Sequence, residues 1–295
     1  MLKVTFKNAL GDSIEMSSTF PYLLKRYSGF SGNEVTTQMA QGFNQNGMYY
    51  HGTLDGVRTL NMTVCFNYSS ELECKEKQKY ITRIFNPRLG MGQITYEDDT
   101  GKYMIDAVVV VKPEIYKTSE DSIMMSRSFD VVLSCPKPDW LTESKQIKMV
   151  DVVGGLTFGL AFPIKFGDRS GDGRITYKGD NPASVILDFR VIDGGDDVEN
   201  PRVENHLGEY IQVKKTLRAN QKILVDTNPD APSITFVDEY GTEFDEWESL
   251  EFGSTFFQLY IDKYESERGL NVFKFTASNG DPEVYLNYRE HYAGV

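Results

Sequence analysis

The residues best suited to chemistry form one dense acidic and aromatic run, residues 238–248, with the sequence DEYGTEFDEWE. Two of its carboxylates, such as Glu243 and Glu246, would act as acid and base or as nucleophile if they lay about 5–9 Å apart around a sugar. In a lectin, Trp247 or Tyr240 would instead stack on a sugar ring. Sequence adjacency does not place two carboxylates across a cleft. The simplest interpretation is a solvated acidic loop whose aromatic side chains pack on the protein.

A second candidate, residues 168–175, imitates the start of a calcium-binding loop. Counted from Asp168, oxygen-bearing residues occupy positions one, three and five, glycine occupies position six, and an apolar residue occupies position eight. The carboxylate needed at position twelve is missing, because Gly179 stands there and Asp180 follows one step late. The flanking residues are typical of strands, and Pro182 would block a following helix. We therefore expect a β-hairpin turn and no metal site.

The remaining histidines and cysteines match no catalytic or cofactor motif. The three histidines are far apart in the sequence: His51, His206 and His291. No nucleophile, paired-histidine or phosphate-binding glycine motif accompanies them. The three cysteines lack metal-ligand spacing: Cys65, Cys74 and Cys135. We expect reduced, mostly buried thiols in a protein made in the cytosol. The sequence predicts no catalytic, cofactor-binding or metal-binding residue, which points to binding or assembly rather than catalysis.

Length, charge and composition limit the remaining possibilities. The chain has 295 residues, 40% of them hydrophobic, so we expect two domains of about 150 residues with real cores. Residues 1–140 hold 15 Lys and Arg against 16 Asp and Glu, whereas residues 141–295 hold 16 against 27. The acidic second half argues against nucleic-acid binding, which needs a basic patch. Without an export signal or an apolar stretch of about 20 residues, we expect neither secretion by that route nor membrane insertion.

The first half, residues 1–140, is predicted to consist of strands and one helix. Alternating apolar residues predict strands at 3–7, 47–51, 58–67, 92–97, 103–111 and 126–134. Ser70-Glu71-Leu72-Glu73 matches a capping box, which predicts the start of an amphipathic helix of about 16 residues that Pro87 ends. The segment Cys135-Pro136-Lys137-Pro138 predicts a domain boundary, because two prolines around one lysine cannot lie inside a sheet ladder.

The second half, residues 141–295, is predicted to be an all-β antiparallel sandwich of about eight strands. Its clearest pattern lies in Ser184–Asp193, where alternate residues share one face of a strand: Val185, Leu187, Phe189 and Val191. Further strands are predicted near 162–166, 210–217, 222–227, 233–237, 255–261, 271–277 and 284–289. Ser278-Asn279-Gly280-Asp281 predicts a hairpin, because Asn-Gly supplies the positive backbone dihedrals that such turns need.

Several short motifs follow one another in a recognisable order along nearly the whole chain. In the first domain they are Tyr27-Ser28-Gly29-Phe30, Gly56-Val57-Arg58-Thr59-Leu60, Ile84-Phe85-Asn86-Pro87 and the segment from Val131 to Trp140. In the second domain they are Phe162-Pro163, Gly179-Asp180-Asn181-Pro182-Ala183, the segment from Asn200 to Asn205 and the closing segment from Tyr288 to Val295. In this order the motifs resemble the distal tail protein of phages with siphovirus-type tails, a family of tail-tip components that prophages also encode.

The resemblance implies a structural protein, not an enzyme. Residues 1–140 would form a split β-barrel with one helix, and residues 141–295 a galectin-like β-sandwich, so the fold would be mainly β. The first domain would form a ring, usually a hexamer, between tail tube and tip at the distal end of the tail in the virion. The implied partners are other copies of the chain, the tail tube protein, the tail-tip or tail-associated lysin protein, and receptor-binding or baseplate proteins. No cofactor is implied, and the protein would be made in the cytoplasm of the bacterial host.

Two other functions remain open beside this structural one. A carbohydrate-binding module would use the sandwich of the second domain directly to recognise a host surface. A glycoside hydrolase would need two convergent carboxylates, for which Glu243 and Glu246 are the candidates. The acidic segment 238–251 does not match the motifs of the tail protein family, so its role stays open.

Overall fold

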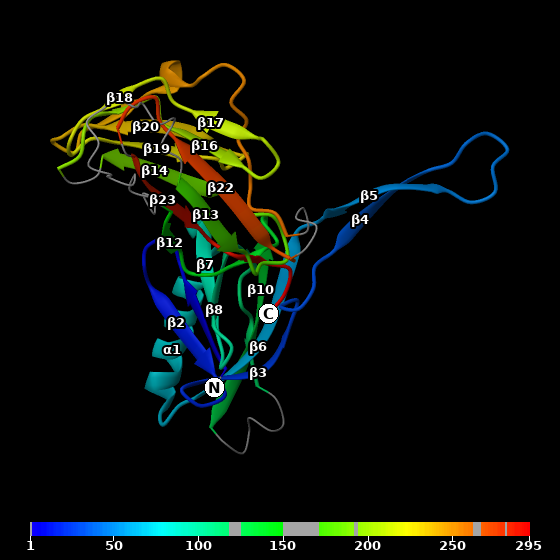
Figure 1. The fold of residues 1–295 in the computed structure, drawn as a ribbon. Helices are drawn as coiled ribbons and strands as arrows, with labels where there is room; N and C mark the ends of the chain where they lie inside the picture. Colours follow the sequence, from blue (N-terminus) through cyan, green and yellow to red (C-terminus); the bar gives the residue numbers. More distant parts are fainter. Residues whose placement is uncertain (1, 118–124, 150–170, 192–193, 262–266, 281) are drawn as a thin grey trace, which may run out of the picture. The chain divides into compact units, whose positions relative to one another are not determined.

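The computed structural model describes residues 2–117, 125–149, 171–191, 194–261, 267–280 and 282–295 (Figure 1). The chain divides into two compact units. The first comprises Met1–Glu143 and Tyr292–Val295, and the second comprises Ser144–His291. The last four residues therefore belong with the first unit, whereas the sequence placed them in a domain of residues 141–295. The fold is mainly β, as predicted, and the described residues contain one α-helix.

The first unit combines this helix with strands that are almost all antiparallel. Helix α1 spans Glu71–Ile84, and the 3₁₀ turn η1 follows at Pro87–Leu89. The strands are β1 (Lys3–Lys7), β2 (Ser13–Ser17), β3 (Tyr22–Ser28), β4 (Val35–Ala40), β5 (Tyr49–Asp55), β6 (Arg58–Asn67), β7 (Met91–Glu97), β8 (Lys102–Val111), β9 (Ile115–Tyr116), β10 (Ser126–Cys135) and β11 (Trp140–Leu141). At the end of the chain, β24 (His291–Tyr292) leads back into this unit.

Most strands of the first unit belong to one sheet that closes on itself. Its order is β24-β11-β8-β7-β1-β2-β3-β6-β10-β9, and a further pairing joins β8 to β10. One register pair of this sheet is parallel, between Ser17 of β2 and Leu23 of β3. Closure of this kind leaves few free sheet edges on the strands that it joins.

The helix begins where the sequence predicts. The hydroxyl of Ser70 accepts a hydrogen bond from the backbone N–H of Glu73 at 3.2 Å. The Glu73 carboxylate accepts in return from the backbone N–H of Ser69 at 2.7 Å, one residue before the position that a capping box uses. The helix is 14 residues long, slightly shorter than predicted, and its C-cap is Phe85.

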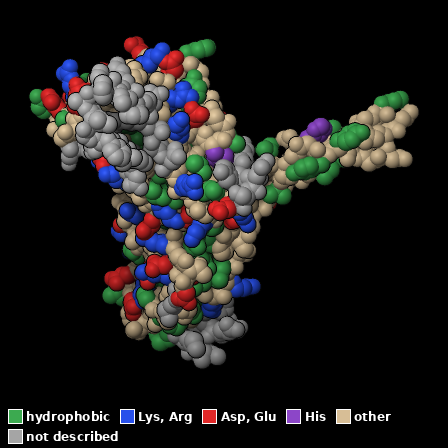
Figure 2. All heavy atoms as spheres, viewed as in Figure 1, with side chains coloured by type: hydrophobic (Ala, Val, Ile, Leu, Met, Phe, Trp, Pro, Cys, Tyr) green, Lys and Arg blue, Asp and Glu red, His purple; other side chains and the backbone are tan. Residues whose placement is uncertain are grey.

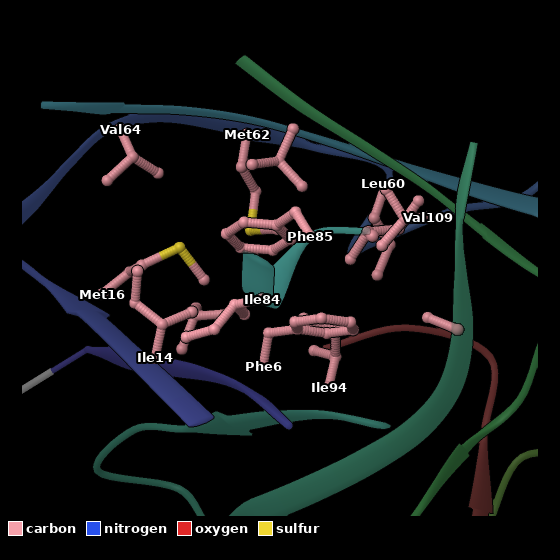
Figure 3. Packing of buried hydrophobic residues seen from close by; sticks show 14 of the residues in the cluster. Phe6, Ile14, Met16, Leu60, Met62, Val64, Ile84, Phe85, Ile94 and Val109 are labelled. Carbon is pink, nitrogen blue, oxygen red and sulfur yellow. The ribbon is translucent and has the colours of Figure 1, made fainter. Parts of the chain in front are cut away.

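The core of the first unit lies between this helix and the surrounding strands (Figure 3). Phe6 of β1 stacks on Phe85, with ring centroids 5.0 Å apart. Ile81 and Ile84 of the helix are fully buried, and so is Met16 of β2. Burying such side chains stabilises a fold by about 1.5–3 kcal/mol each, which fastens the amphipathic helix to the strands.

The second unit consists of two larger sheets and a small pair. The six-stranded sheet has the order β12-β23-β14-β19-β20-β21, the four-stranded sheet β13-β22-β16-β17, and the pair is β15-β18. The strands are β12 (Lys145–Lys148), β13 (Gly171–Thr176), β14 (Val185–Val191), β15 (Val198–Glu199), β16 (Arg202–Asn205), β17 (Tyr210–Gln212), β18 (Thr216–Leu217), β19 (Lys222–Asp226), β20 (Ser233–Val237), β21 (Glu243–Asp245), β22 (Leu270–Thr276) and β23 (Pro282–Tyr288). A 3₁₀ turn, η2, spans Trp247–Ser249.

Strand β14 confirms the clearest sequence pattern. Val185, Leu187 and Phe189 are buried on one face, as the alternation predicts. Asp188 is also buried, although the sequence placed it on the opposite face, because the Arg190 guanidinium pairs with its carboxylate at 2.5 Å. A buried carboxylate needs such a partner to offset the loss of solvation.

Of the strands predicted for the second unit, one is split in two and one is wrong. The run 210–217 is interrupted after Gln212, because Val213 forms an isolated bridge with Leu250 that leads the chain away from β17. The run 255–261 contains no described strand and contributes only one isolated bridge, between Leu259 and Ala183. In the run 255–261 the apolar alternation reflects burial against another segment and not membership of a sheet ladder.

The predicted hairpin at 278–281 is also wrong. Gly280 has the positive φ of 74° that an Asn-Gly turn needs. However, the strands on either side, β22 and β23, belong to different sheets. The turn therefore carries the chain from one sheet to the other. The predicted strand at 162–166 and the first part of the calcium-like loop, residues 168–170, lie outside the described residues. The rest of that loop is not the predicted turn, because residues 171–175 belong to strand β13 and pair with β22.

Candidate functional site: an uncharged arm and its base

Strands β4 and β5 form an arm that extends from the rest of the first unit (Figure 1). Among the described strands they pair only with each other, from Val35 opposite Asp55 to Ala40 opposite Tyr49. Every residue of the two strands is exposed except the half-buried Gly52. An isolated two-stranded hairpin is at best marginally stable in water. The arm must therefore be supported at its base or by a partner.

The surface of the arm is uncharged and carries several exposed hydrophobic side chains. The 20 residues from Val35 to Leu54 contain no Asp, Glu, Lys or Arg. Figure 2 shows hydrophobic side chains along the arm. Phe43 in the connecting loop is 99% exposed, and Met39 and Tyr50, which face each other in the register, are 56% and 65% exposed. Exposed apolar surface on this scale marks a protein interaction site.

A buried arginine, Arg58, lies at the base of the arm. Its guanidinium donates to five backbone carbonyl oxygens: Gly29 (2.8 Å), Phe30 (3.0 Å), Gly32 (3.2 Å), Pro138 (2.6 Å) and Ala293 (2.5 Å). The side chain is fully buried, and this burial lowers its pKa. An arginine remains protonated even then, because its ordinary pKa is far above neutral. Arg58 therefore ties three distant segments of the chain together through their backbones.

Phe30 collects further contacts at the same place. Its ring stacks on Trp140, with centroids 5.4 Å apart, and its carbonyl oxygen accepts from the Trp140 indole N–H at 3.0 Å. The same carbonyl accepts from the backbone N–H of Val295 at 3.1 Å. The Phe30 ring also packs edge-on against Tyr27, with centroids 5.2 Å apart. The last residues of the chain are thus anchored next to the residue that leads into the arm.

Two glycines allow the chain segments to approach each other here. Gly29 has a φ of +89°, and a Cβ atom at this position would lie 2.0 Å from the carbonyl oxygen of Thr59. Gly56 donates its N–H to the carbonyl oxygen of Glu34 at 2.7 Å, and a Cβ atom there would lie 2.9 Å from that oxygen. The second contact closes the arm where its two strands leave the body of the unit.

These contacts unite segments that the sequence analysis could only place in order. The motifs around Gly29, Arg58, Trp140 and Val295 all meet at the base of the arm. Sequence reasoning missed the arm itself, because it predicted only a strand at 47–51. The signal was present as an uninterrupted uncharged stretch with turn-forming glycine and asparagine residues at its centre.

The acidic run of the second unit does not form an acid–base pair in the described structure. Glu243 lies exposed on the edge strand β21. Glu246 forms an ion pair with Lys215 at 2.8 Å and accepts from the Ser249 hydroxyl at 2.5 Å. Burial opposes ionisation of Glu246, but these hydrogen bonds outweigh it and lower its pKa. Glu246 is therefore ionised and poorly suited to donate a proton, while acidic residues on an edge strand discourage pairing with other strands.

The aromatic residues of that run differ in exposure. Trp247 packs edge-on against Phe256, with ring centroids 5.8 Å apart, whereas Tyr240 is 85% exposed. Phe244 lies 6.2 Å from Phe236 by ring centroids. The interpretation of a solvated loop with packed aromatics thus holds for Trp247 and Phe244 but not for Tyr240.

The other sequence candidates bring no metal or nucleophile together in the described residues. They contain no group of three or more His, Cys, Asp or Glu side chains able to hold a metal ion. His51 lies on the arm, whereas His206 and His291 lie in the second unit. The three cysteines are buried and none forms a disulfide; burial raises the pKa of the Cys135 thiol to about 12. Within the same residues no helix is long and apolar enough to cross a membrane.

A family model matches most of the first unit. A family model described as the phage tail protein RIFT-related domain (Sipho_tail) matches residues 10–125. The RIFT-related domain contains the whole arm, most of the residues at its base and helix α1. The match confirms, for these residues, the predicted resemblance to siphovirus-type tail proteins.

The fold of the whole chain is similar to that of a solved phage protein. The Dit protein (gp 19.1) of SPP1, described as a paradigm of the hub adsorption apparatus in phages that infect Gram-positive bacteria, aligns with a TM-score of 0.68 and 10% identity. The alignment covers 98% of each chain, so the likeness of fold extends beyond the RIFT-related domain. The baseplate of phage P2 in its activated conformation with Ca aligns with a TM-score of 0.49 and 12% identity over 100% of both chains. The search of curated proteins found no match.

Proposed function

We propose that the protein is a structural hub component of a phage tail tip or baseplate, located at the distal end of the tail in the virion. The observation that carries this proposal is the arm of the RIFT-related domain, whose exposed apolar surface has no partner within the described chain. A monomer gains nothing from exposing such a surface to water. A protein that assembles with copies of itself or with other tail proteins gains an interface from it.

Assembly into a closed ring fits the distribution of charge. Ring closure repeats one head-to-tail contact, so each subunit needs two complementary surfaces on one body. Residues 1–140 are nearly neutral, with 15 basic against 16 acidic residues, and packing copies of them around an axis creates little repulsion. The first unit would form the ring, which would be a hexamer as the family resemblance implies. The acidic second unit would lie on the outer surface of that ring.

The second unit would then hold further components of the tip. In this role the protein contacts the tail tube protein on one side and the tail-tip or tail-associated lysin protein on the other, while receptor-binding or baseplate proteins attach to the sandwich. The split-barrel form of the first unit and the galectin-like form of the second are part of this proposal. The role is structural, without catalysis.

The arm can be tested by placing charge on it. Met39→Glu and Leu54→Glu each put a carboxylate on exposed positions of the arm, 56% and 58% exposed in the wild type. Leu72→Glu is the matched control, because Leu72 lies on helix α1 of the same unit and is 70% exposed. Native mass spectrometry and electron microscopy of the full chain over a range of high concentrations would measure assembly.

We expect the wild type and Leu72→Glu to assemble into rings, and both arm variants to remain monomeric with unchanged melting temperature. Burying an unpaired carboxylate in an apolar interface costs several kcal/mol, enough to prevent assembly. Rings formed equally well by the arm variants would rule out the arm as the assembly surface. A monomer at low micromolar concentration does not bear on the matter, because ring closure depends on concentration.

A further inference from the structure

The outer face of the four-stranded sheet in the second unit contains a polar groove. It has a volume of about 320 Å³, and its lining includes Asn200, Arg202, Glu204, Gln212, Lys274 and Thr276. These residues come from β16, β17, β22 and the ends of those strands. Small-ligand sites measure about 300–1,000 Å³, so the groove has room for a small ligand.

The strand register arranges the side chains of the groove in two adjacent rows. The first row is Thr276, Arg202 and Gln212, and the second is Lys274, Glu204 and Tyr210. Between the rows, Val203 of β16 is fully buried on the opposite face of the sheet. Because side chains alternate along each strand, both rows point outward from the core.

The centre of the groove is ordered by contacts within the protein. The Arg202 guanidinium donates to the Glu204 carboxylate at 2.6 Å. Its central carbon also lies 3.7 Å from the centre of the Tyr210 ring. Side chains held in this way lose little conformational entropy when a ligand binds. Around them, Lys274, Gln212 and Thr276 make no side-chain hydrogen bond or ion pair within the described part of the chain, so their polar atoms are available to a ligand.

This combination of groups suits a polyhydroxylated ligand. Each sugar hydroxyl both donates and accepts a hydrogen bond, and the groove alternates the corresponding partners. Arg202 and Lys274 only donate, Glu204 only accepts, and Gln212 does both. A polyanion would meet Glu204 and an acidic half-chain of 16 basic against 27 acidic residues. An apolar peptide would leave these polar groups without partners.

We propose that the groove is a saccharide-binding site of the second unit. The site would let a hub protein hold a sugar of a cell surface directly, in addition to the proteins that it assembles with. It lies on strands distant in sequence from the acidic run 238–248, which the sequence analysis considered for sugar binding. Saccharide binding here requires no ring, so its failure would leave the proposed role in tail assembly untouched.

The test is ligand-observed NMR on the full chain. Saturation transfer would be measured against a panel of neutral disaccharides of glucose, galactose, mannose and their N-acetylated amino sugars, each at millimolar concentration, and the strongest would be titrated. Lys274→Ala and Glu204→Gln alter the groove. Lys222→Ala is the control, because Lys222 lies on β19 of the other large sheet.

We expect at least one disaccharide to bind the wild type, and both groove variants to bind it about tenfold more weakly or worse, because Lys274→Ala removes a charged donor and Glu204→Gln turns a charged acceptor into a neutral one. Lys222→Ala should bind like the wild type. Gln212→Ala replaces Glu204→Gln if the latter lowers the melting temperature. Absence of saturation transfer from the wild type to every disaccharide of the panel would overturn the assignment, and so would groove variants that bind with wild-type affinity.

Discussion

The arm and its base are neighbours in the first unit, yet they depend on opposite kinds of interaction. The base is built from buried groups whose partners are backbone atoms of distant segments, with Arg58 at the centre. The arm is built from exposed side chains, and its strands pair only with each other among those described. Sequence changes at the base should therefore act on folding, and changes on the arm should act on assembly.

The largest effect on folding is expected from Arg58→Met, which keeps the length of the side chain but removes every donor. Five backbone carbonyl oxygens would each lose a hydrogen bond from a buried guanidinium, so we expect the first unit to lose about 3–5 kcal/mol of unfolding free energy. The measurement is denaturant unfolding followed by Trp140 fluorescence in a Trp247→Phe background, where Trp140 is the remaining tryptophan. Arg26→Met, an exposed arginine on β3, is the control and should change stability by less than about 0.5 kcal/mol.

Equal stabilities of Arg58→Met and Arg26→Met would show that the hydrogen bonds of the base contribute nothing net. Arg58→Lys adds a graded comparison, because lysine keeps the charge but lacks the planar fork that reaches several carbonyls at once. We expect its stability to lie between that of Arg58→Met and that of the wild type.

A second large effect is expected from Gly29→Ala, because the new methyl group would lie 2.0 Å from the carbonyl oxygen of Thr59. We expect a loss of about 3 kcal/mol in the same fluorescence assay, combining backbone strain with the clash. Gly11→Ala separates the two causes. Gly11 has a nearly identical φ of +91° with no atom within 4 Å of the added Cβ, so it should lose only about 1–2 kcal/mol. A similar loss in both variants would mean that the base relaxes around the methyl group.

A smaller effect on the same unit should appear at alkaline pH. Burial raises the pKa of Cys135 from 9.0 to about 12, so the folded state holds the thiol proton more tightly than the unfolded state. This contribution to stability is complete below pH 9 and is lost as the pH rises from 9 towards 12. Over this pH range the unfolding free energy of Cys135→Ala should decline less steeply than that of the wild type. The difference in slope should be at most about 1.4 kcal/mol per pH unit. Parallel declines would show that Cys135 ionises normally in the folded protein.

The sequence predicted the local features of the base and the core well, but it did not predict which distant segments contact one another at the base. The capping box at Ser70 and the strand from Arg58 depend on neighbouring residues, so periodicity and capping patterns found them. The convergence of Gly29, Arg58, Trp140 and Val295 depends on contacts between segments up to hundreds of residues apart. Their order along the chain indicated a family, but no pattern in the sequence indicates which carbonyl oxygens a buried arginine binds.

The arm and the groove were harder to predict for different reasons. Strand prediction relies on one apolar face, and β4 and β5 have none because both faces are exposed. The groove is assembled from three strands of one sheet, so Arg202, Gln212 and Lys274 become neighbours only through the register. The acidic run 238–248 attracted attention because its residues are adjacent in sequence, yet Glu246 is paired with Lys215 and Glu243 lies on an exposed edge.

The smallest effect on stability is expected from substitutions on the arm. A comparison of two methionines, one on the arm and one in the core, tests the contrast between the two regions most directly. Met39 on the arm is 56% exposed, whereas Met16 of β2 is fully buried in the core of the same unit. At concentrations where the chain is monomeric, Met39→Ser should change the unfolding free energy by less than about 0.5 kcal/mol, because it removes no buried contact. Met16→Ser should cost about 2–5 kcal/mol, because it leaves a cavity and buries a hydroxyl. If Met39→Ser instead destabilised the monomer as strongly as Met16→Ser, the arm would have to pack on its own chain in solution, and its exposed surface would not be free for a partner.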